Sequence, residues 1–227
     1  MIFMNSRYRL LSYPINIATP IYGSNPELKI MPYSRIANGD SSNSAVISVH
    51  NHTGTHVDAP KHFIDEGRSI SDYSPDELIF RNPLIADCPK GEAALIMPGD
   101  LQHFSHLFQS RDCLLLHTGF TKFRGEEKYR IHNPGIAPET ILWIRKEYPN
   151  IRCIGIDSIS ISSFQHRNSG REAHKLAFVK KNDLGEPLLI IEDMKLDIIK
   201  NLIEVIVIPW QVQELDSAPC SVLAVVI

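Results

Sequence analysis

Residues 50–63 read HNHTGTHVDAPKHF and gather four histidines and one aspartate around a glycine and two threonines. In a helix, His52 and His56 would share a face, but Asp58 would lie about 200° further round. In an extended chain that continues the apolar run before it, every second residue of the segment would project to the same side, because side chains alternate along a strand. We therefore expect an extended segment, in which Gly54 leaves a space at the centre of the row.

A divalent metal suits this set of side chains. Imidazole nitrogens and carboxylate oxygens bind zinc, manganese or iron at roughly 2.0–2.2 Å, and leaving such groups buried and unpaired is costly. A single histidine is more often an ordinary hydrogen-bonded residue than a ligand. A cluster beside an apolar strand, however, favours a metal site. Within this cluster the sequence leaves three roles open for His50: a metal ligand, a hydrogen-bond donor that supports a ligand, or an ordinary strand residue.

Pro60 separates His62 from the other histidines. Because proline lacks an N–H, Pro60 ends the extended stretch and turns the chain, so that His62 approaches the cluster from another direction. An unperturbed imidazole titrates at about pH 6.5, which suits proton transfer at neutral pH. We interpret His62 as a proton carrier rather than as a ligand.

The composition excludes several classes of protein. The 227 residues are 43% hydrophobic and carry a formal net charge of -3, so they provide no basic surface for nucleic acid. The N-terminal residues lack a signal-peptide pattern, and the apolar runs are too short to span a bilayer. Four cysteines stand singly among apolar neighbours, as reduced buried thiols do. We expect a cytoplasmic protein without a membrane partner, with residues 1–227 forming one domain.

Short β-branched runs, each bounded by turn residues, predict six strands. These strands cover residues 45–49, 113–116, 151–156, 188–191, 205–208 and 222–227. The stretch APETILWIRKEYP at 137–149 predicts a helix, with Pro138 at its start and Pro149 as its stop. Strands mixed with a few helices predict an α/β fold with a mixed sheet, in which the strands can form two layers.

A second helix is predicted over residues 169–182, SGREAHKLAFVKKN. Ser169 would be its N-cap and Glu172, three residues on, would complete a capping box. His174 would then lie just past the first turn, where the positive end of the helix dipole disfavours an imidazolium. The helix leads away from His174 and the strand after it can return over a similar length. The side chains of Glu192 and His174 can therefore lie close together.

Residues 52–63 match the pattern HxGTHxDxPxHF and resemble the metal-dependent cyclase-like hydrolases, the family of bacterial kynurenine formamidase and isatin hydrolase. The likeness extends over most of the chain. It includes HTGF at 117–120, NPGIAPETILWI at 133–144, IGIDSISI at 154–161, AHKLAF at 173–178, IIED at 190–193 and the closing PWQVQELDSAPCSVLAVV.

The resemblance implies a fold and a set of site residues. The family's fold is a compact swivelling β/β/α arrangement, and its members are usually homo-oligomers, so a homodimer or homotetramer is expected. By resemblance, one metal is held by His52, His56 and Asp58, and a second by His174. Asp58 and Glu192 would bridge the two ions, and His62 would be the catalytic acid and base. The ions would be zinc or manganese, one or two per chain.

The reaction implied is hydrolysis of a small amide, formamide, lactam or ester by metal-activated water, with His62 as general acid and base. The chain would then be an arylformamidase-like amidohydrolase that acts on C–N bonds other than peptide bonds. The segment TPIYGSNPELKI at 19–30 supplies Tyr22 but no tryptophan where kynurenine formamidases place a substrate-loop aromatic. The resemblance therefore does not extend to kynurenine specificity.

Other kinds of site are less well supported. A Ser-based triad would need a G-x-S-x-G elbow, and nucleotide binding would need a glycine-rich phosphate loop; the sequence has neither. His117 could line a pocket or merely end a strand. The alternative to an enzyme is a non-catalytic, metal-containing protein that binds a small ligand, whose metal would have four protein ligands and no water position.

Overall fold

The computed structural model describes residues 7–196 and 199–227. Its strands are β1 Tyr8–Leu10, β2 Lys29–Ser34, β3 Ser44–Ser48, β4 His56–Asp58, β5 Ile79–Phe80, β6 Pro83–Asp87, β7 Leu95–Ile96, β8 Cys113–His117, β9 Gly135–Ile136, β10 Cys153–Ile156, β11 Leu189–Glu192, β12 Leu202–Pro209 and β13 Ser217–Val226. Its α-helices are α1 Pro98–Leu101, α2 Ser105–Phe108, α3 Glu127–Ile131, α4 Pro138–Glu147 and α5 Arg167–Phe178.

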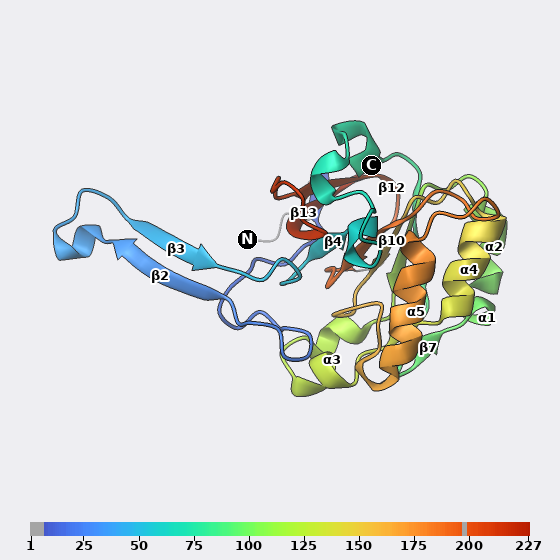
Figure 1. The fold of residues 1–227 in the computed structure, drawn as a ribbon, viewed down its shortest axis with the longest axis horizontal. Coiled ribbons are helices and arrows are strands. Elements are labelled where there is room, and N and C mark those ends of the chain that lie inside the picture. The colour runs from blue at the N-terminus through green and yellow to red at the C-terminus, as the bar shows by residue number, and fades with distance from the viewer. Residues whose placement is uncertain (1–6, 197–198) are drawn as a thin grey trace.

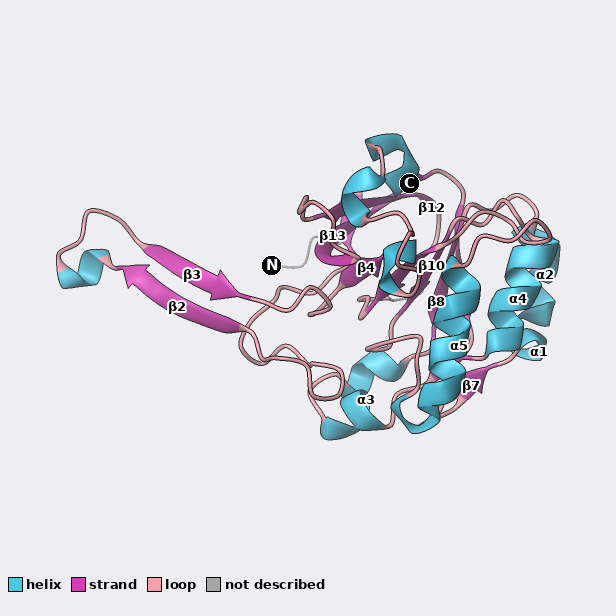
Figure 2. Cartoon of the chain, in the orientation of Figure 1, coloured by secondary structure: helices cyan, strands magenta, loops and turns pink. Residues whose placement is uncertain are grey.

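One large mixed sheet organises the fold, which confirms the α/β class expected from the sequence (Figures 1 and 2). Its strand order is β5-β12-β13-β4-β11-β10-β8-β6, and β1 pairs with β13. Strands β6, β8, β10 and β11 run parallel. Strand β4 is antiparallel to both of its neighbours, β11 and β13. Because β6 at one end also contacts β12 near the other, the sheet curls back on itself.

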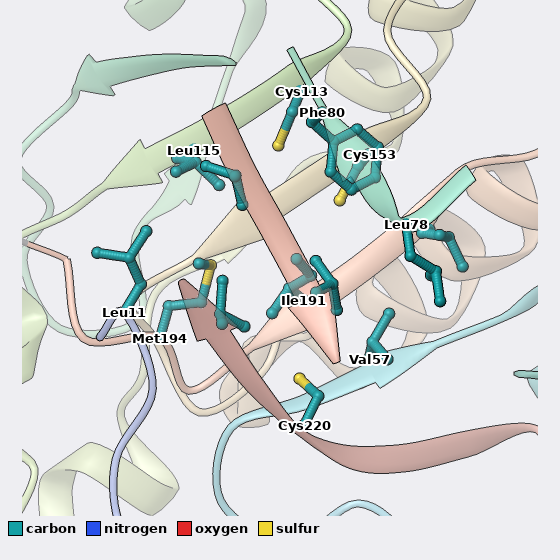
Figure 3. Close-up of a cluster of buried hydrophobic side chains, with 14 of the residues drawn as sticks. Leu11, Val57, Leu78, Phe80, Cys113, Leu115, Cys153, Ile191, Met194 and Cys220 are labelled. Carbon is teal, nitrogen blue, oxygen red and sulfur yellow. The ribbon is translucent and has the colours of Figure 1, made fainter. Parts of the chain in front are cut away.

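The parallel strands are buried on both faces. In β8, Cys113 and Leu115 point to a core shared with β12 and β13, whereas Leu114 and Leu116 point to a core shared with α4 and α5. Figure 3 shows the first core, in which Ile191 of β11 also lies. Alternation along each strand therefore produces three layers, two of strand and one of helix, because each strand carries apolar side chains in both directions.

The two predicted helices are present, but the start of the second was wrong. Helix α4 lies within the predicted range, with Pro138 at its first position. Helix α5 begins at Arg167, since a 3-10 turn at Phe164–His166 leads directly into it. Ser169 is therefore inside the helix and is not its N-cap. His174 consequently lies in the second half of α5, away from the positive end of the helix dipole.

The six predicted strands all correspond to observed strands, with shifted ends. The strand expected at 222–227 begins at Ser217 instead and contains Pro219, which faces His56 of β4 in the register. Proline in a strand normally indicates an edge or a break, so the sequence gives little sign that the strand begins before Pro219. Strands β1, β2, β5, β6, β7 and β9 were not predicted.

The extended row predicted for residues 50–58 was wrong. After β3 the chain turns at residues 51–54 and becomes a strand only from His56 to Asp58. Gly54 has a left-handed φ of +68°, and a Cβ there would lie 2.8 Å from Cγ2 of Ile15. The space beside Gly54 is thus occupied by Ile15 and Thr19 and is not where an ion would bind.

Strands β2 and β3 form a hairpin that projects from the body of the molecule (Figure 1). Both strands are exposed along nearly their whole length, and large apolar side chains on them are open to solvent. The most exposed are Tyr33 at 81% and Ile47 at 50%, followed by Met31 and Val46 at 49% each. Within the described residues, no helix is long and apolar enough to cross a membrane.

Replacing Gly54 with alanine should destabilise the fold by about 1–3 kcal/mol, because the side chain must adopt a left-handed conformation and meet Ile15. Gly119 is a matched control, since it has the same φ of +68° but open space around its Cβ position. Urea unfolding of the two variants should therefore show the larger loss for Gly54→Ala. Equal losses would show that contact with Ile15 adds nothing to the backbone strain.

Candidate metal centre

A cavity of about 540 Å³ opens beside β4. Its lining includes His52, His56, His62, His174 and Glu192, five of the six site residues expected from the sequence. The sixth, Asp58, is fully buried beneath them. The structure thus brings together residues that are up to 140 positions apart in the chain.

The register of the sheet places the carboxylates. Val57 of β4 points into the strand-lined core, so His56 and Asp58 on either side of it point to the opposite face. Strand β11 runs antiparallel to β4 and sets Glu192 directly opposite His56. His56 Nε2 lies 3.3 Å from Glu192 Oε2 and 3.5 Å from Asp58 Oδ1.

Backbone carbonyls orient two of the histidines. His56 Nδ1 donates to the carbonyl of Gly54 at 2.8 Å, and His174 Nδ1 donates to the carbonyl of Gly170 at 2.9 Å. A carbonyl only accepts, so the proton is on Nδ1 and the lone pair is on Nε2 in the neutral ring. Both Nε2 atoms face the cluster, and His174 Nε2 lies 3.4 Å from Glu192 Oε1. This is how metal-binding histidines are usually held.

Three buried atoms in the cluster fit a cation. His56 Nε2 and both oxygens of Asp58 have no hydrogen-bond partner among the described residues. His52 Nδ1 approaches Asp58 Oδ1 to 3.0 Å, and ligand atoms of His52, His56 and Asp58 lie within 4.8 Å of one another. A second such group comprises Asp58, His62 and His174. Nitrogen and carboxylate donors at this spacing suit a divalent metal.

The cluster's charges depend strongly on one another. Burial raises the pKa of Asp58, but the histidines around it outweigh burial and hold that pKa well below its ordinary value. Burial likewise raises the pKa of Glu192, yet His174 and His56 lower it to about 2. Burial lowers the pKa of His52, while Asp58 and Asp216 raise it, to about 10. Buried carboxylates here are charged and need positive partners, which protons or a divalent cation can supply.

The expected lowering of the pKa of His174 by a helix dipole was wrong. Burial does lower that pKa, but the carboxylates of Glu192 and Asp58 raise it above the ordinary value. Since His174 lies in the second half of α5, the dipole at the start of the helix has little effect on it.

Asp216 is a site residue that the sequence did not identify. It lies just before β13, and its Oδ2 accepts from His62 Nδ1 at 2.7 Å and faces His52 Nε2 at 3.0 Å. Asn51 donates to Oδ1 at 2.7 Å. The only local signal was an acidic residue before a strand, in a stretch that already resembled the family. Its function depends on β13 pairing with β4, which brings Ser217 opposite Asp58.

His62 belongs to a 3-10 turn at Pro60–His62, so Pro60 does redirect the chain as expected. The His62 ring centre is 4.2 Å from that of His52 and 5.7 Å from that of His174. Its side chain is 26% exposed, which leaves it accessible from the cavity. The structure thus places His62 close enough to the cluster for either a ligand role or proton transfer.

The two histidines of open role lie in different places. His50 lines the cavity, with its ring centre 5.5 Å from that of His52. Burial, and then the neighbouring His52, lower the pKa of His50. His117 Nδ1 instead contacts Asp87 Oδ1 at 2.8 Å, across β6 and β8. It is not among the residues that line this cavity.

A second network holds the ends of β4 and β11 together. Asp193, which follows Glu192, has a positive φ of 50°. Its carboxylate accepts from Arg124 at 2.6 and 2.8 Å and from the Tyr129 hydroxyl at 2.6 Å. Its carbonyl accepts from the Thr55 hydroxyl at 2.7 Å. The residues next to His56 and Glu192 are therefore joined, which fixes these two side chains relative to each other.

Fold and site together define an α/β protein with a cluster of histidines and carboxylates that could hold a divalent metal at the floor of a cavity. The chain belongs to the cyclase family, since residues 10–163 match the family model described as "Putative cyclase".

Named relatives and solved structures agree with this family. The chain is 26% identical to a kynurenine formamidase of Erythrobacter litoralis, over 92% of this chain and 89% of the relative. It superposes on isatin hydrolase A from Labrenzia aggregata with a TM-score of 0.81 and 22% identity, covering 97% and 93% of the two chains. The chain also superposes on a "predicted metal-dependent hydrolase from Bacillus stearothermophilus" with a TM-score of 0.71 and 21% sequence identity, covering 96% of this chain and 97% of that one.

Metal content should depend on the buried ligands. Purified protein reconstituted with zinc or manganese should hold one or two ions per chain, and Asp58→Asn should weaken binding tenfold or more, because a charged ligand is lost. His117→Gln is the control, as His117 lies outside the cavity. Elemental analysis after desalting gives the readout. Retention of metal by Asp58→Asn at the level of the control would remove Asp58 from the ligand set.

Proposed function

We propose that this chain is a metal-dependent amidohydrolase that cleaves a C–N bond in a small amide, formamide or lactam. The observation that carries the proposal is a group of buried atoms without a hydrogen-bond partner among the described residues, beneath a cavity that His62 also lines: His56 Nε2 and the two oxygens of Asp58. The names of the relatives, a formamidase and an isatin hydrolase, support hydrolysis of this kind.

The proposed ligands are His52, His56, Asp58, His174 and Glu192, holding one or two zinc or manganese ions. When bound, the metal would act as a Lewis acid and lower the pKa of water to about 7. Ser160 and the amide of Ile161 donate to Glu192 Oε1 at 2.9 and 2.7 Å, which orients its carboxylate toward the histidines. These contacts support a ligand set that is fixed before the metal arrives.

His62 and Asp216 would handle protons. Asp216 accepts the Nδ1 proton of His62 at 2.7 Å, so His62 Nε2 is the nitrogen that can take up a proton or release it. The carboxylate would also hold the ring of His62 in one orientation. His62 would receive a proton from the attacking water and deliver it to the leaving nitrogen.

The walls of the cavity favour a small, partly aromatic substrate. Tyr22 and Phe63 both line it. The ring of Phe63 stacks on His174 at 4.9 Å between centres, and Tyr22 packs edge-on against Phe164 at 5.8 Å. Flat apolar surfaces beside the cluster suit an aryl group attached to the scissile amide.

The alternative is a metal-containing protein that binds a ligand without turning it over. A structural metal site is closed by protein ligands, whereas this cluster borders a cavity and His52 and His62 are 14% and 26% exposed. That access favours the enzyme. Unfolding on chelation together with no turnover across a panel of amides and lactams would favour the alternative.

We also propose that the chain assembles as a homodimer or homotetramer in the cytoplasm. A two-stranded hairpin alone is marginally stable in water, and β2–β3 exposes apolar side chains on both faces. A second copy that covers Tyr33 and Ile47 would supply the missing packing. Four free, buried cysteines are compatible with a reducing compartment.

Turnover should depend on His62 separately from metal binding. With zinc or manganese bound, wild-type protein should hydrolyse N-formylaniline, an isatin-like lactam or a cyclic imide. His62→Ala should keep its metal and lose about 10²- to 10⁴-fold in kcat, because it removes the proton carrier. Asp216→Asn should lose about 10- to 100-fold, because the ring of His62 is less well oriented. Loss of metal from His62→Ala would reassign His62 as a ligand.

The hairpin should control assembly. A Tyr33→Ser, Ile47→Ser double variant should dissociate into monomers at concentrations where the wild-type protein is a dimer or tetramer, because it removes exposed apolar area from β2 and β3. Sedimentation velocity measures the mass. Val212→Ser is a control, since Val212 is 45% exposed outside the hairpin. A wild-type monomer would refute the assembly.

A further inference from the structure

Two arginines of α5 stand at the rim of the cavity. Arg167 and Arg171 line it together with His174, and all three belong to one stretch of helix. At 100° per residue, Arg171 is about 40° round the helix from Arg167, and His174 is about 20° from Arg167 on the other side. The three side chains therefore share one face, with the arginines about 4–10 Å along the axis from the histidine.

The arginines are free to bind a ligand. Both side chains are exposed, and neither forms an ion pair or hydrogen bond with another described residue. Arg167 packs its guanidinium over the ring of Phe164 at 3.9 Å, which leaves its N–H groups unused. The charges of both arginines affect the hydroxyl of Tyr22. Burial and Glu192 raise the pKa of Tyr22 to about 12, whereas Arg167 and Arg171 lower it.

Charge is divided between the floor and the rim of this cavity. The carboxylates of Asp58 and Glu192 are buried at the floor and face histidines. The arginines are exposed at the rim, and Tyr22 lines the same cavity. An anionic group would be repelled by the floor carboxylates and attracted by the rim. A guanidinium group can donate two parallel N–H hydrogen bonds to a carboxylate, which makes arginine well suited to bind one.

We propose that Arg167 and Arg171 bind a carboxylate carried by the substrate, so that the preferred substrates are aromatic amides with an acid group on the side away from the scissile bond. This inference rests on the proposed hydrolase function and narrows its substrate class. The aryl ring would lie beside Tyr22 and Phe63, with the amide at the floor and the carboxylate at the rim.

A matched pair of substrates tests specificity. The zinc-loaded protein should hydrolyse N-formyl-4-aminobenzoate with a kcat/KM at least tenfold above that for N-formylaniline, mainly through KM. The ratio of kcat/KM for N-formyl-4-aminobenzoate to kcat/KM for N-formylaniline should fall about tenfold in Arg171→Gln. It should fall further in the Arg167→Gln, Arg171→Gln double variant. Arg171→Lys should fall between wild type and Arg171→Gln, because it keeps the charge but loses the fork.

Lys175→Gln is the control. Lys175 is exposed on the same helix and does not line the cavity, so this variant makes the same charge change without touching the proposed site. Its ratio should equal that of the wild-type protein. A fall equal to that of Arg171→Gln would mean that overall charge, and not a carboxylate contact, sets the preference.

Binding without turnover separates this inference from the proposed function. Calorimetric titration of the zinc-loaded protein with benzoate should show binding that weakens at least tenfold in the double variant and is unchanged in Lys175→Gln. Equal benzoate affinity in wild-type and double-variant protein would overturn the carboxylate site. Arginine-dependent benzoate binding with no hydrolysis of the two anilides, an isatin-like lactam or a cyclic imide would instead overturn the hydrolase and leave the carboxylate site in place.

Discussion

The carboxylate of Asp58 is the constraint on which the rest of the structure depends. It is fully buried, it remains ionised, and neither oxygen has a hydrogen-bond partner among the described residues. Burying an unpaired charge costs several kcal/mol, so the fold must place positive groups around it. It does so with His52 and His56 from the same short segment and with His174 from a helix.

The three-residue strand β4 can carry this buried charge because the strands on both sides of β4 pair with it. Pairing with β11 sets Glu192 beside His56, and pairing with β13 brings Asp216 to His52. The Asp193 network adds a tie between the ends of β4 and β11. A site built on strands at the centre of a sheet is held more rigidly than one built on loops, which suits side chains that must keep fixed positions relative to one another.

The fold was largely predictable because the strands are apolar in both directions. Cys113 to Leu116 and Leu188 to Ile191 are continuous apolar runs, as expected of strands buried on both faces. Residues 50–58 were less predictable, because the alternation of histidines suggested a strand whereas the left-handed φ of Gly54 interrupts the extended chain. The first half of β13 was similarly hard to predict, because it contains Pro219 and proline normally argues against a strand.

The sequence by itself determined the kind of chemistry, because His52, His56, Asp58 and His62 are neighbours in the chain and any compact conformation keeps them close. Only the tertiary structure decided which distant groups join them. Asp216 enters through the pairing of β13 with β4, and Arg167 shares a helix with Arg171 and His174 because α5 begins earlier than its sequence indicates. Register and helix start are set by packing between segments, and no local pattern records that packing.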